Sequence, residues 1–333
     1  MNKTILGFVV GAALFCGLFL WQGIDTVGGL LSEAGIALAL VCLFSPPEQL
    51  LAAEAWRRLF PPGSRPRYVR VLLASWMGSA VNTLLPVATI GGELAKARIL
   101  ILWFHPGAET MAAMIVDKTI QAIAVVVWGL VGMGFLVFFV GDSGTVVGVL
   151  IGAGFLVLGI AGFIFVQIRG GFSIIADKLT AWVKDGKGEA ILQDVETMEI
   201  SIREIYRDVG RLAAATALRL FQRVFLAGEV VLIGYLLGAP IGIVEAVILK
   251  GVIGAIRGFS FAIPGALGVQ EGGYVAIGAI LGYPPDLMIA LSLATRIREI
   301  LPSIPFLLYW QVTEGRTIWS RHKKNSAPKM DAE

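Results

Sequence analysis

Two stretches of this sequence place proline and glutamate inside long apolar regions. In the first, Pro86 precedes Glu93 by seven residues, and in the second Pro264 precedes Glu271 by the same spacing. Proline breaks a helix, and the hydrocarbon core of a membrane offers no water to the freed backbone groups. Such a break therefore survives only where it is buried in protein or lines a polar cavity. The two stretches predict broken helices around a transport site at membrane depth.

Ionisable side chains within the apolar regions supply the chemistry of that site. A charge at the centre of a membrane costs about 2.5–3.5 kcal/mol on insertion scales and indicates function by default. The candidate site residues are Asn82, Pro86, Gly92, Glu93, Lys96, Asp117, Lys118, Arg257, Pro264, Gly268, Glu271, Arg296 and Arg298. Ionisable positions of the same kind are Glu48, Arg98, Lys250 and Glu299. For Arg98, Lys118 and Lys250 the alternative is a structural role, with each side chain reaching the membrane surface.

These residue types suit an amphiphile with a charged head group. Arginine presents a planar fork that pairs with phosphate oxygens, and helix N-termini favour anions. We expect Arg257 and Arg296 to hold phosphate or hydroxyl groups, and the helix N-termini after the two breaks to point at them. For Glu93 and Glu271 three roles stay open. They pair with those cations in the empty site, hold a cationic part of the head group, or carry a coupling proton.

The surrounding elements follow from composition. The 333 residues are 56% hydrophobic and 15% charged, with a mean hydropathy of +0.80, which excludes a soluble globular protein. Because a spanning helix needs about 20 apolar residues, we expect an all-α polytopic membrane protein with about six full transmembrane helices. The predicted spans are residues 4–21, 34–56, 111–140, 145–168, 211–237 and 286–312. Cys16 and Cys42 lie in apolar segments and indicate neither a disulfide nor a metal site.

The distribution of lysine and arginine predicts the topology, since cytoplasmic loops gather these residues. Basic residues concentrate in segments 57–70, 169–211 and 316–324, which we assign to the cytoplasm together with both termini. Regions 71–104 and 244–282 then each begin and end on one side of the membrane. Their arms of about 15 residues are short for full spans. We therefore predict two re-entrant helical hairpins of opposite orientation, in an inverted repeat of the kind that secondary transporters use.

A single transmembrane domain is expected over residues 1–321, followed by a disordered cytoplasmic tail over 322–333. Segment 169–210 is the one extended polar stretch and is predicted to lie on the cytoplasmic side. Apolar residues recur in it at three- and four-residue spacing, which favours a helix lying on the bilayer or on the bundle over a partner-binding module. This apolar stripe consists of Ile191, Val195, Met198 and Ile202.

The motifs around these residues resemble a known family. They are Asn82-Thr83-Leu84-Leu85-Pro86, Gly92-Glu93 with Lys96, Asp117-Lys118, and Pro264-Gly265-Ala266-Leu267-Gly268-Val269-Gln270-Glu271 followed by Arg296. The chain is similar over nearly its whole length to the lysylphosphatidylglycerol synthase transmembrane (flippase-like) family, and we also consider its hopanoid-biosynthesis-associated subgroup. In two places it departs from the family pattern. Val87 and Ala88 stand where an arginine usually follows the proline, and Lys118 replaces a more typical arginine, which leaves the head-group preference open.

This resemblance implies a membrane-embedded helical bundle that moves lipids between leaflets of the bacterial inner membrane. It implies no enzymatic activity, cofactor or metal for this chain. In the two-domain members of the family, lipid aminoacylation looks like the work of a soluble domain that follows the membrane part. We expect no room for such a domain before Glu333. No HExxH or GxSxG motif occurs, and His105 and His322 are not expected to form a metal cluster. The expected partners are membrane lipids, with lipid-biosynthetic enzymes and a homodimer left open and nucleic acid excluded.

Two functions of other classes remain as alternatives. The first is a non-transporting scaffold that docks lipid-biosynthetic enzymes through segment 169–210. The second is a secondary transporter of an ion or small solute built on the same inverted-repeat plan.

Overall fold

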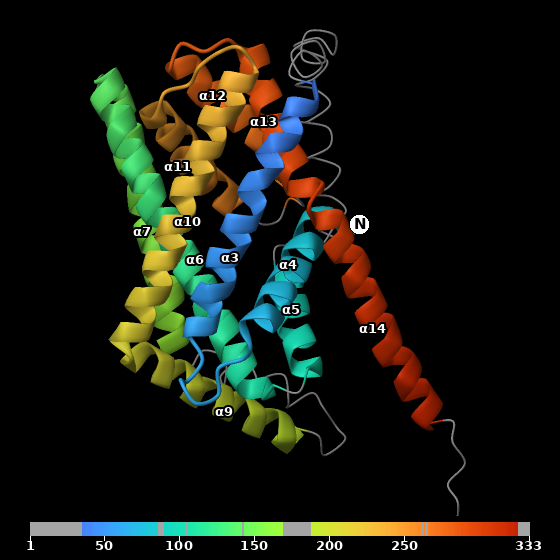
Figure 1. The fold of residues 1–333 in the computed structure, drawn as a ribbon. Helices are drawn as coiled ribbons and strands as arrows, with labels where there is room; N and C mark the ends of the chain where they lie inside the picture. The colour runs from blue at the N-terminus through green and yellow to red at the C-terminus, as the bar shows by residue number, and fades with distance from the viewer. Residues whose placement is uncertain are drawn as a thin grey trace, which may run out of the picture.

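The structure, a computed structural model, describes residues 35–85, 90–103, 105–141, 143–168, 188–260, 263 and 266–325. All regular elements in this part of the chain are helices, as Figure 1 shows, which confirms the predicted all-α class. Helices of the first half are η1 (Gly35–Phe44, a 3-10 helix), α3 (Ser45–Arg58), α4 (Tyr68–Leu84), α5 (Ile90–Leu102), α6 (Gly107–Val140) and α7 (Ser143–Ile168). Those of the second half are α9 (Gly188–Arg207), α10 (Val209–Leu236), α11 (Ile243–Phe259), α12 (Val269–Ile280), α13 (Pro285–Ile300) and α14 (Ser303–Asn325).

Helices occur at most of the positions predicted for spans. The predicted spans 34–56, 111–140, 145–168 and 211–237 correspond to η1 with α3, α6, α7 and α10. The predicted span 4–21 lies outside the described residues. By length and composition, one described stretch, Gly107–Phe139, qualifies as long and apolar enough to cross a membrane.

One predicted span, 286–312, is wrong as a single helix, because α13 ends at Ile300 and α14 begins at Ser303. Pro302 lies at the break; it has no backbone N–H to donate and clashes with the preceding turn. Two hydroxyl groups satisfy carbonyls at the break. Ser45 donates to the Arg298 carbonyl (3.1 Å) and Ser303 donates to the Glu299 carbonyl (2.6 Å). The break thereby fixes the last turn of α13 against α3.

Two helical hairpins are present, α4 with α5 and α11 with α12, and they correspond to the predicted regions 71–104 and 244–282. Their arms contain 17 and 13 residues in the first hairpin and 17 and 12 in the second. In Figure 1 the two hairpins enter the bundle from opposite ends, α11 and α12 from above and α4 and α5 from below. Pro86 and Pro264, predicted to break the hairpins, lie outside the described residues.

The order of elements required by the predicted repeat occurs twice. A helix, a hairpin and a helix follow one another as α3 to α6, and again as α10 to α13 with α14. Helix α6 packs on its own hairpin through α5 and on the other hairpin through α11. In the second half α13 packs on α12, while α14 packs on α4, where Trp76 stacks on Phe306 with ring centroids 4.1 Å apart. Helices α13 and α14 together therefore correspond to α6.

Helix α9 lies across one end of the bundle (Figure 1). Met198, Ile202 and Ile205 are buried in the core formed with α3 to α6. The predicted stripe therefore packs on the bundle through Met198 and Ile202, while the side chain of Ile191 lies outside the described residues. Residues 322–325, predicted as the start of a disordered tail, form the last turn of α14, where lysines favour the helix C-terminus.

Asp208 ends α9 and caps α10. Its carboxylate accepts a hydrogen bond from the Arg211 backbone N–H (3.0 Å) and pairs with the Arg211 guanidinium (2.6 Å). The guanidinium bond, more than any other contact, holds the pKa of the Asp208 carboxyl below its usual range. This cap fixes the corner at which the chain enters α10.

Helices α6 and α11 cross closely at a pair of glycines. A Cβ atom on Gly251 would lie 2.6 Å from the Trp128 carbonyl oxygen and 3.2 Å from the Gly132 Cα. Small residues allow such close approach between membrane helices. Gly254, on the same helix, has open space around its Cβ position.

We expect Gly251→Ala to lower the free energy of unfolding by about 1–3 kcal/mol, because the added methyl group forces α6 and α11 apart. Gly254→Ala is the matched control and should be neutral or slightly stabilising, since alanine favours the helix. Unfolding in mixed micelles, followed by circular dichroism, measures both variants. Equal effects of the two substitutions would contradict this packing.

Candidate functional site

Asn82 and Gly92, both predicted site residues, hold the first hairpin together. The Gly92 N–H at the start of α5 donates to Asn82 Oδ1 on α4 (2.7 Å). A Cβ atom on Gly92 would lie 2.1 Å from the Gly78 carbonyl oxygen, so the arms are in close contact. In this structure the two residues shape the hairpin, and the predicted N-terminal anion site of α5 is partly used by Asn82.

The second arm of this hairpin carries buried ion pairs to α6. Lys96 Nζ lies 2.6 Å from Glu93 Oε2 and 2.8 Å from Asp117 Oδ2. Lys118 Nζ lies 3.2 Å from Glu93 Oε1. Four predicted site residues are thus brought into one cluster, in which Glu93 pairs with Lys96 and Lys118.

Asp117 also binds α10, through an arginine that the sequence analysis did not select. Arg219 Nη2 lies 2.7 and 2.8 Å from the two Asp117 oxygens. The Asp117 side chain has no exposed surface and that of Arg219 is 8% exposed. The Lys96 ammonium also lies 4.8 Å from the centre of the Trp56 ring. This pairing satisfies charges that are far too costly to bury alone.

A second set of ion pairs surrounds the end of α13. Arg298 binds Glu48 on α3 and lies 2.9 Å from Glu229 Oε1 on α10. Lys250 Nζ on α11 lies 3.2 Å from Glu229 Oε2. The alternative that Lys250 reaches the membrane surface is wrong, because its side chain is 12% exposed and its charge is used by a fully buried carboxylate.

Two further ion pairs of this set meet at Glu299, and one of them joins the second hairpin to α13. Arg257 Nη1 lies 2.9 Å from Glu299 Oε1, and Arg298 Nη2 lies 3.8 Å from the same oxygen. Arg257 and Arg298, both predicted site residues, therefore meet at Glu299. This carboxylate holds two cations at the break between α13 and α14.

Gln222 connects the two sets. Its amide oxygen accepts from Arg219 Nη1 (3.2 Å), and its amide nitrogen donates to Glu48 Oε1 (3.3 Å). We use the name charged network for the connected residues Glu48, Glu93, Lys96, Asp117, Lys118, Arg219, Gln222, Glu229, Lys250, Arg257, Arg298 and Glu299. It runs without interruption from the first hairpin through α6, α10 and α3 to α13 and the second hairpin.

Glu271 has a separate set of partners at the start of α12. Its carboxylate lies 2.5 Å from Arg296 Nε and accepts from the Gly268 N–H (2.7 Å), and Ser292 donates to it (3.4 Å). Gly268 has φ +75°, a backbone conformation that favours glycine. The α12 N-terminus thus binds a carboxylate of its own chain, where the sequence analysis expects a head group.

The two hairpins place equivalent ion pairs at equivalent positions. Glu93 pairs with Lys118 and Glu271 pairs with Arg296, and both pairs join residues 25 positions apart. In each case the glutamate lies in the first turn of the second arm and the cation lies on the following helix. This correspondence supports the repeat more specifically than the order of elements does.

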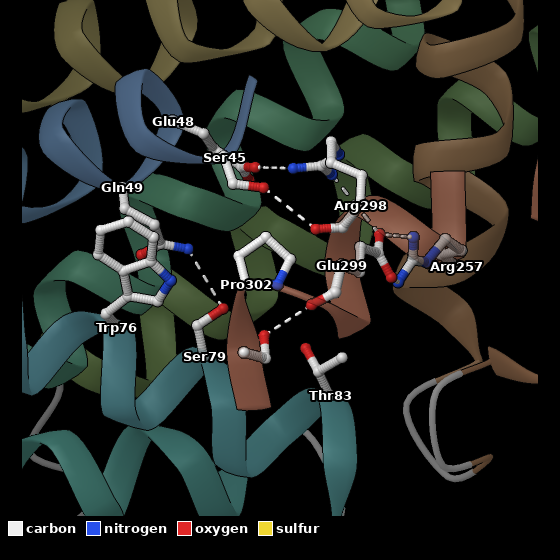
Figure 2. Close-up of a pocket in the computed structure, with 11 residues that line it drawn as sticks. Ser45, Glu48, Gln49, Trp76, Ser79, Thr83, Arg257, Arg298, Glu299 and Pro302 are labelled. Carbon is white, nitrogen blue, oxygen red and sulfur yellow. Dashed lines mark hydrogen bonds and ion pairs between the residues drawn. The ribbon is translucent and has the colours of Figure 1, made fainter. Parts of the chain in front are cut away.

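A pocket with a volume of about 180 Å³ opens at the break between α13 and α14, next to α3 and α4. This volume is well above the roughly 10–15 Å³ that one water molecule requires. Figure 2 shows Glu48, Arg257, Arg298 and Glu299 along one side and Ser79 and Thr83 on the other. The lining residues are Ser45, Glu48, Gln49, Trp76, Ser79, Thr83, Arg257, Arg298, Glu299, Pro302 and Ser303. Of the predicted site residues, Arg257 and Arg298 line this pocket.

The sequence analysis missed the polar face of α10. Arg219, Gln222 and Glu229 are all buried there, with Leu226 and Val230. Gln222, Leu226, Glu229 and Val230 follow Arg219 by three, seven, ten and eleven residues. This spacing is typical of one helix face. The signal that could have identified these residues is the helical spacing of charged side chains inside the predicted span 211–237.

A family comparison decides the class of this protein. The family model described as "Lysylphosphatidylglycerol synthase TM region" matches residues 5–305. The chain belongs to this family. Comparisons with curated proteins and with solved structures gave no match. The hopanoid-biosynthesis-associated subgroup stays a prediction.

As a member of the lysylphosphatidylglycerol synthase TM family, the protein is a membrane protein whose family is related to the handling of membrane lipids. Charged residues in such a protein are tolerated when they face the bundle interior and pair with one another. The charged network meets this condition. Within the part of the chain that the structure describes, no group of three or more His, Cys, Asp or Glu residues is arranged to hold a metal ion.

Proposed function

We propose that this protein moves an amphiphilic lipid, either a phospholipid or a polycyclic lipid, between membrane leaflets through a polar site at mid-depth. The observation that carries the proposal is the charged network that joins both hairpins to the pocket at the α13–α14 break. Charges at membrane depth are costly and mark substrate paths in transporters. Membership of a lipid-related family favours a lipid over an ion or small solute.

The proposed topology has about six full spans, two re-entrant hairpins in an inverted repeat and both termini in the cytoplasm of a bacterial cell. Arms of 12 to 17 residues support re-entrant hairpins. At 1.5 Å per residue they are about 18–26 Å long, below the roughly 30 Å thickness of the hydrocarbon core. The opposite entry of the two hairpins in Figure 1 supports the inverted arrangement.

The proposed mechanism uses exchange of ion-pair partners. A head-group phosphate enters the pocket and competes with Glu299 for Arg257. Further along the second hairpin it competes with Glu271 for Arg296, while the lipid tails stay in the bilayer. Return of each carboxylate to its arginine releases the head group. Glu93 with Lys118 performs the equivalent gating step at the first hairpin. This mechanism involves no covalent chemistry and no cofactor, and we propose that the chain is not an enzyme.

Lipid scrambling in proteoliposomes tests this function. Phospholipids that carry a fluorescent head group are quenched by a membrane-impermeant reductant. Empty liposomes lose about half of the signal, because the inner leaflet is protected. We expect the protein to increase the loss well beyond half for at least one head group. Arg98→Gln, which alters a half-exposed pair with Glu314, is the matched control and should behave as wild type. A folded protein that gives the signal of empty liposomes with every head group contradicts the proposal.

A further inference from the structure

The charged wall of the pocket in Figure 2 carries no net charge. Its ionisable residues supply two guanidinium groups and two carboxylates. Arg298 binds Glu48, and Arg257 Nη1 lies 2.9 Å from Glu299 Oε1. Each charge is thus already paired within the same wall. The wall therefore attracts neither an anion nor a cation by its net charge, and its selectivity must come from hydrogen bonds.

The paired groups of this wall still offer both donors and acceptors. Arg257 donates to Glu299 through Nη1 and Nη2, at 2.9 and 3.5 Å. A guanidinium has five N–H donors and a carboxylate about four lone-pair sites, so sites of both kinds remain. A phosphate offers no donor to the two carboxylates, and an ammonium offers no acceptor to the two guanidinium groups. A hydroxyl group both donates and accepts, so a polyhydroxyl ligand uses this wall most completely.

The opposite wall, on α4, presents two hydroxyl groups. Ser79 Oγ accepts from Gln49 Nε2 (3.2 Å), so its own O–H stays available as a donor. Thr83 lines the pocket and has no hydrogen bond to another part of the chain that the structure describes. In Figure 2 both hydroxyl oxygens lie on the side of α4 that faces Pro302 and Glu299. A ligand rich in hydroxyl groups therefore finds partners on both walls.

The size of the pocket limits the ligand to a small group. Its volume is about 180 Å³, and a cavity of about 150 Å³ in another protein holds a benzene ring. A glycerol group or a single sugar ring fits this space. Trp76 and Pro302 add apolar surface against which the carbon skeleton of such a group can pack. The stack of Trp76 on Phe306 holds the indole ring in place.

We infer that this pocket binds a polyhydroxyl head group, and that Ser79 and Thr83 select it. The hydroxyl groups come from the glycerol of a phospholipid or from the sugar of a glycolipid. The inference deepens the proposed function, on which the choice of a lipid as the ligand rests. In a phospholipid the phosphate exchanges with Glu299 at Arg257, and the glycerol beyond it reaches the α4 wall.

The test measures binding to the purified full-length protein, from the rise in thermal midpoint with ligand concentration. The detergent is a polyoxyethylene ether, whose head group carries no sugar. Dihexanoyl-phosphatidylglycerol is compared with dihexanoyl-phosphatidylmethanol, which has the same charge and no head-group hydroxyl. Glucosyl-dihexanoylglycerol is compared with dihexanoylglycerol, which lacks the sugar. We expect the member with the additional hydroxyl groups to bind at least about tenfold more tightly in one or both pairs.

Two variants assign this preference to the α4 wall. Thr83→Val removes one hydroxyl group at nearly constant shape and should weaken binding of the preferred lipid about three- to tenfold. Ser79→Ala/Thr83→Val should weaken it by at least about tenfold. Neither variant should change the affinity for phosphatidylmethanol. Thr313→Val is the matched control, because the Thr313 hydroxyl donates to the Tyr309 carbonyl (2.8 Å) on α14 and does not line the pocket.

The ligand-free protein separates selection from a structural role. Thr83→Val breaks no hydrogen bond within the described residues, so the thermal midpoint without ligand should be unchanged. It therefore keeps the inference testable if Ser79→Ala/Thr83→Val does not fold. A preference confined to phosphatidylglycerol supports a phospholipid as the source, and one confined to the glucolipid supports a glycolipid.

Equal affinities within both lipid pairs overturn the inference, since hydroxyl groups then contribute nothing to binding. An equal loss of phosphatidylglycerol and phosphatidylmethanol binding in Thr83→Val also overturns it. Failure of the proposed function gives a different result. Hydroxyl-dependent binding in a protein that scrambles no lipid supports the site and contradicts transport, whereas scrambling without a hydroxyl preference does the reverse.

Discussion

Asp117→Asn is expected to lower the free energy of unfolding by about 3–5 kcal/mol, the typical cost of removing one partner from a buried ion pair. The Asp117 carboxylate is fully buried and binds both Lys96 and Arg219. Asparagine has nearly the same volume, so the packing is preserved while Arg219 loses its paired carboxylate and Lys96 keeps only Glu93. Unfolding in mixed micelles, followed by circular dichroism, measures the difference.

Two further variants give this experiment its controls. Arg98→Gln breaks an ion pair whose arginine side chain is 51% exposed and should cost no more than about 1 kcal/mol. The double variant Asp117→Asn/Arg219→Gln removes the cation that the single variant leaves unpaired and should recover part of the lost stability. A cost for Asp117→Asn no larger than that of Arg98→Gln would show that the network is solvated and would contradict its buried character.

Glu271→Gln is expected to reduce lipid scrambling by at least about tenfold while the protein stays folded. Glutamine keeps an oxygen that accepts from the Gly268 N–H, so the start of α12 remains capped. It loses the charge that competes with a head group for Arg296, which lies 2.5 Å away. Without that competitor the head group stays bound, and a lost charge-assisted hydrogen bond corresponds to more than a factor of ten.

The matched control for this prediction is Glu314→Gln, which neutralises a carboxylate paired with a half-exposed arginine on the side of the bundle. It should scramble lipids at the wild-type rate. Proteoliposomes with equal protein content, and circular dichroism of each variant, provide the comparison. If Glu271→Gln scrambles at the wild-type rate, the exchange of partners at the second hairpin is not part of transport.

The elements of this fold could largely be predicted from the sequence, because hydropathy and helix breaks are local properties. Apolar runs of the right length predicted α6, α7 and α10, and short arms predicted the two hairpins. The division of the last span was missed, although Pro302 is a local signal for it. Here the length of the apolar run was given more weight than the proline within it.

The candidate site was predicted less completely, since residue type does not reveal the partner. The sequence analysis selected Glu93, Lys96, Asp117 and Lys118, which the structure brings together. It expected Arg257 and Arg296 to bind phosphate and left open whether Glu93 and Glu271 pair with them. In the structure Glu271 holds Arg296, and Arg257 is held by Glu299, which the sequence analysis did not propose as its partner.

The sequence by itself determined the helical class, the family, the hairpins and the presence of charges in apolar regions, all of which follow from composition and from neighbours along the chain. Only the tertiary structure decided which charges neutralise one another. Arg298 reaches Glu48 across 250 positions, and Arg219 reaches Asp117 across 102. Such pairs depend on how α10 and α13 dock against α3 and α6. Electrostatic attraction acts through space, so the partner of each charge becomes visible only once the helices are packed.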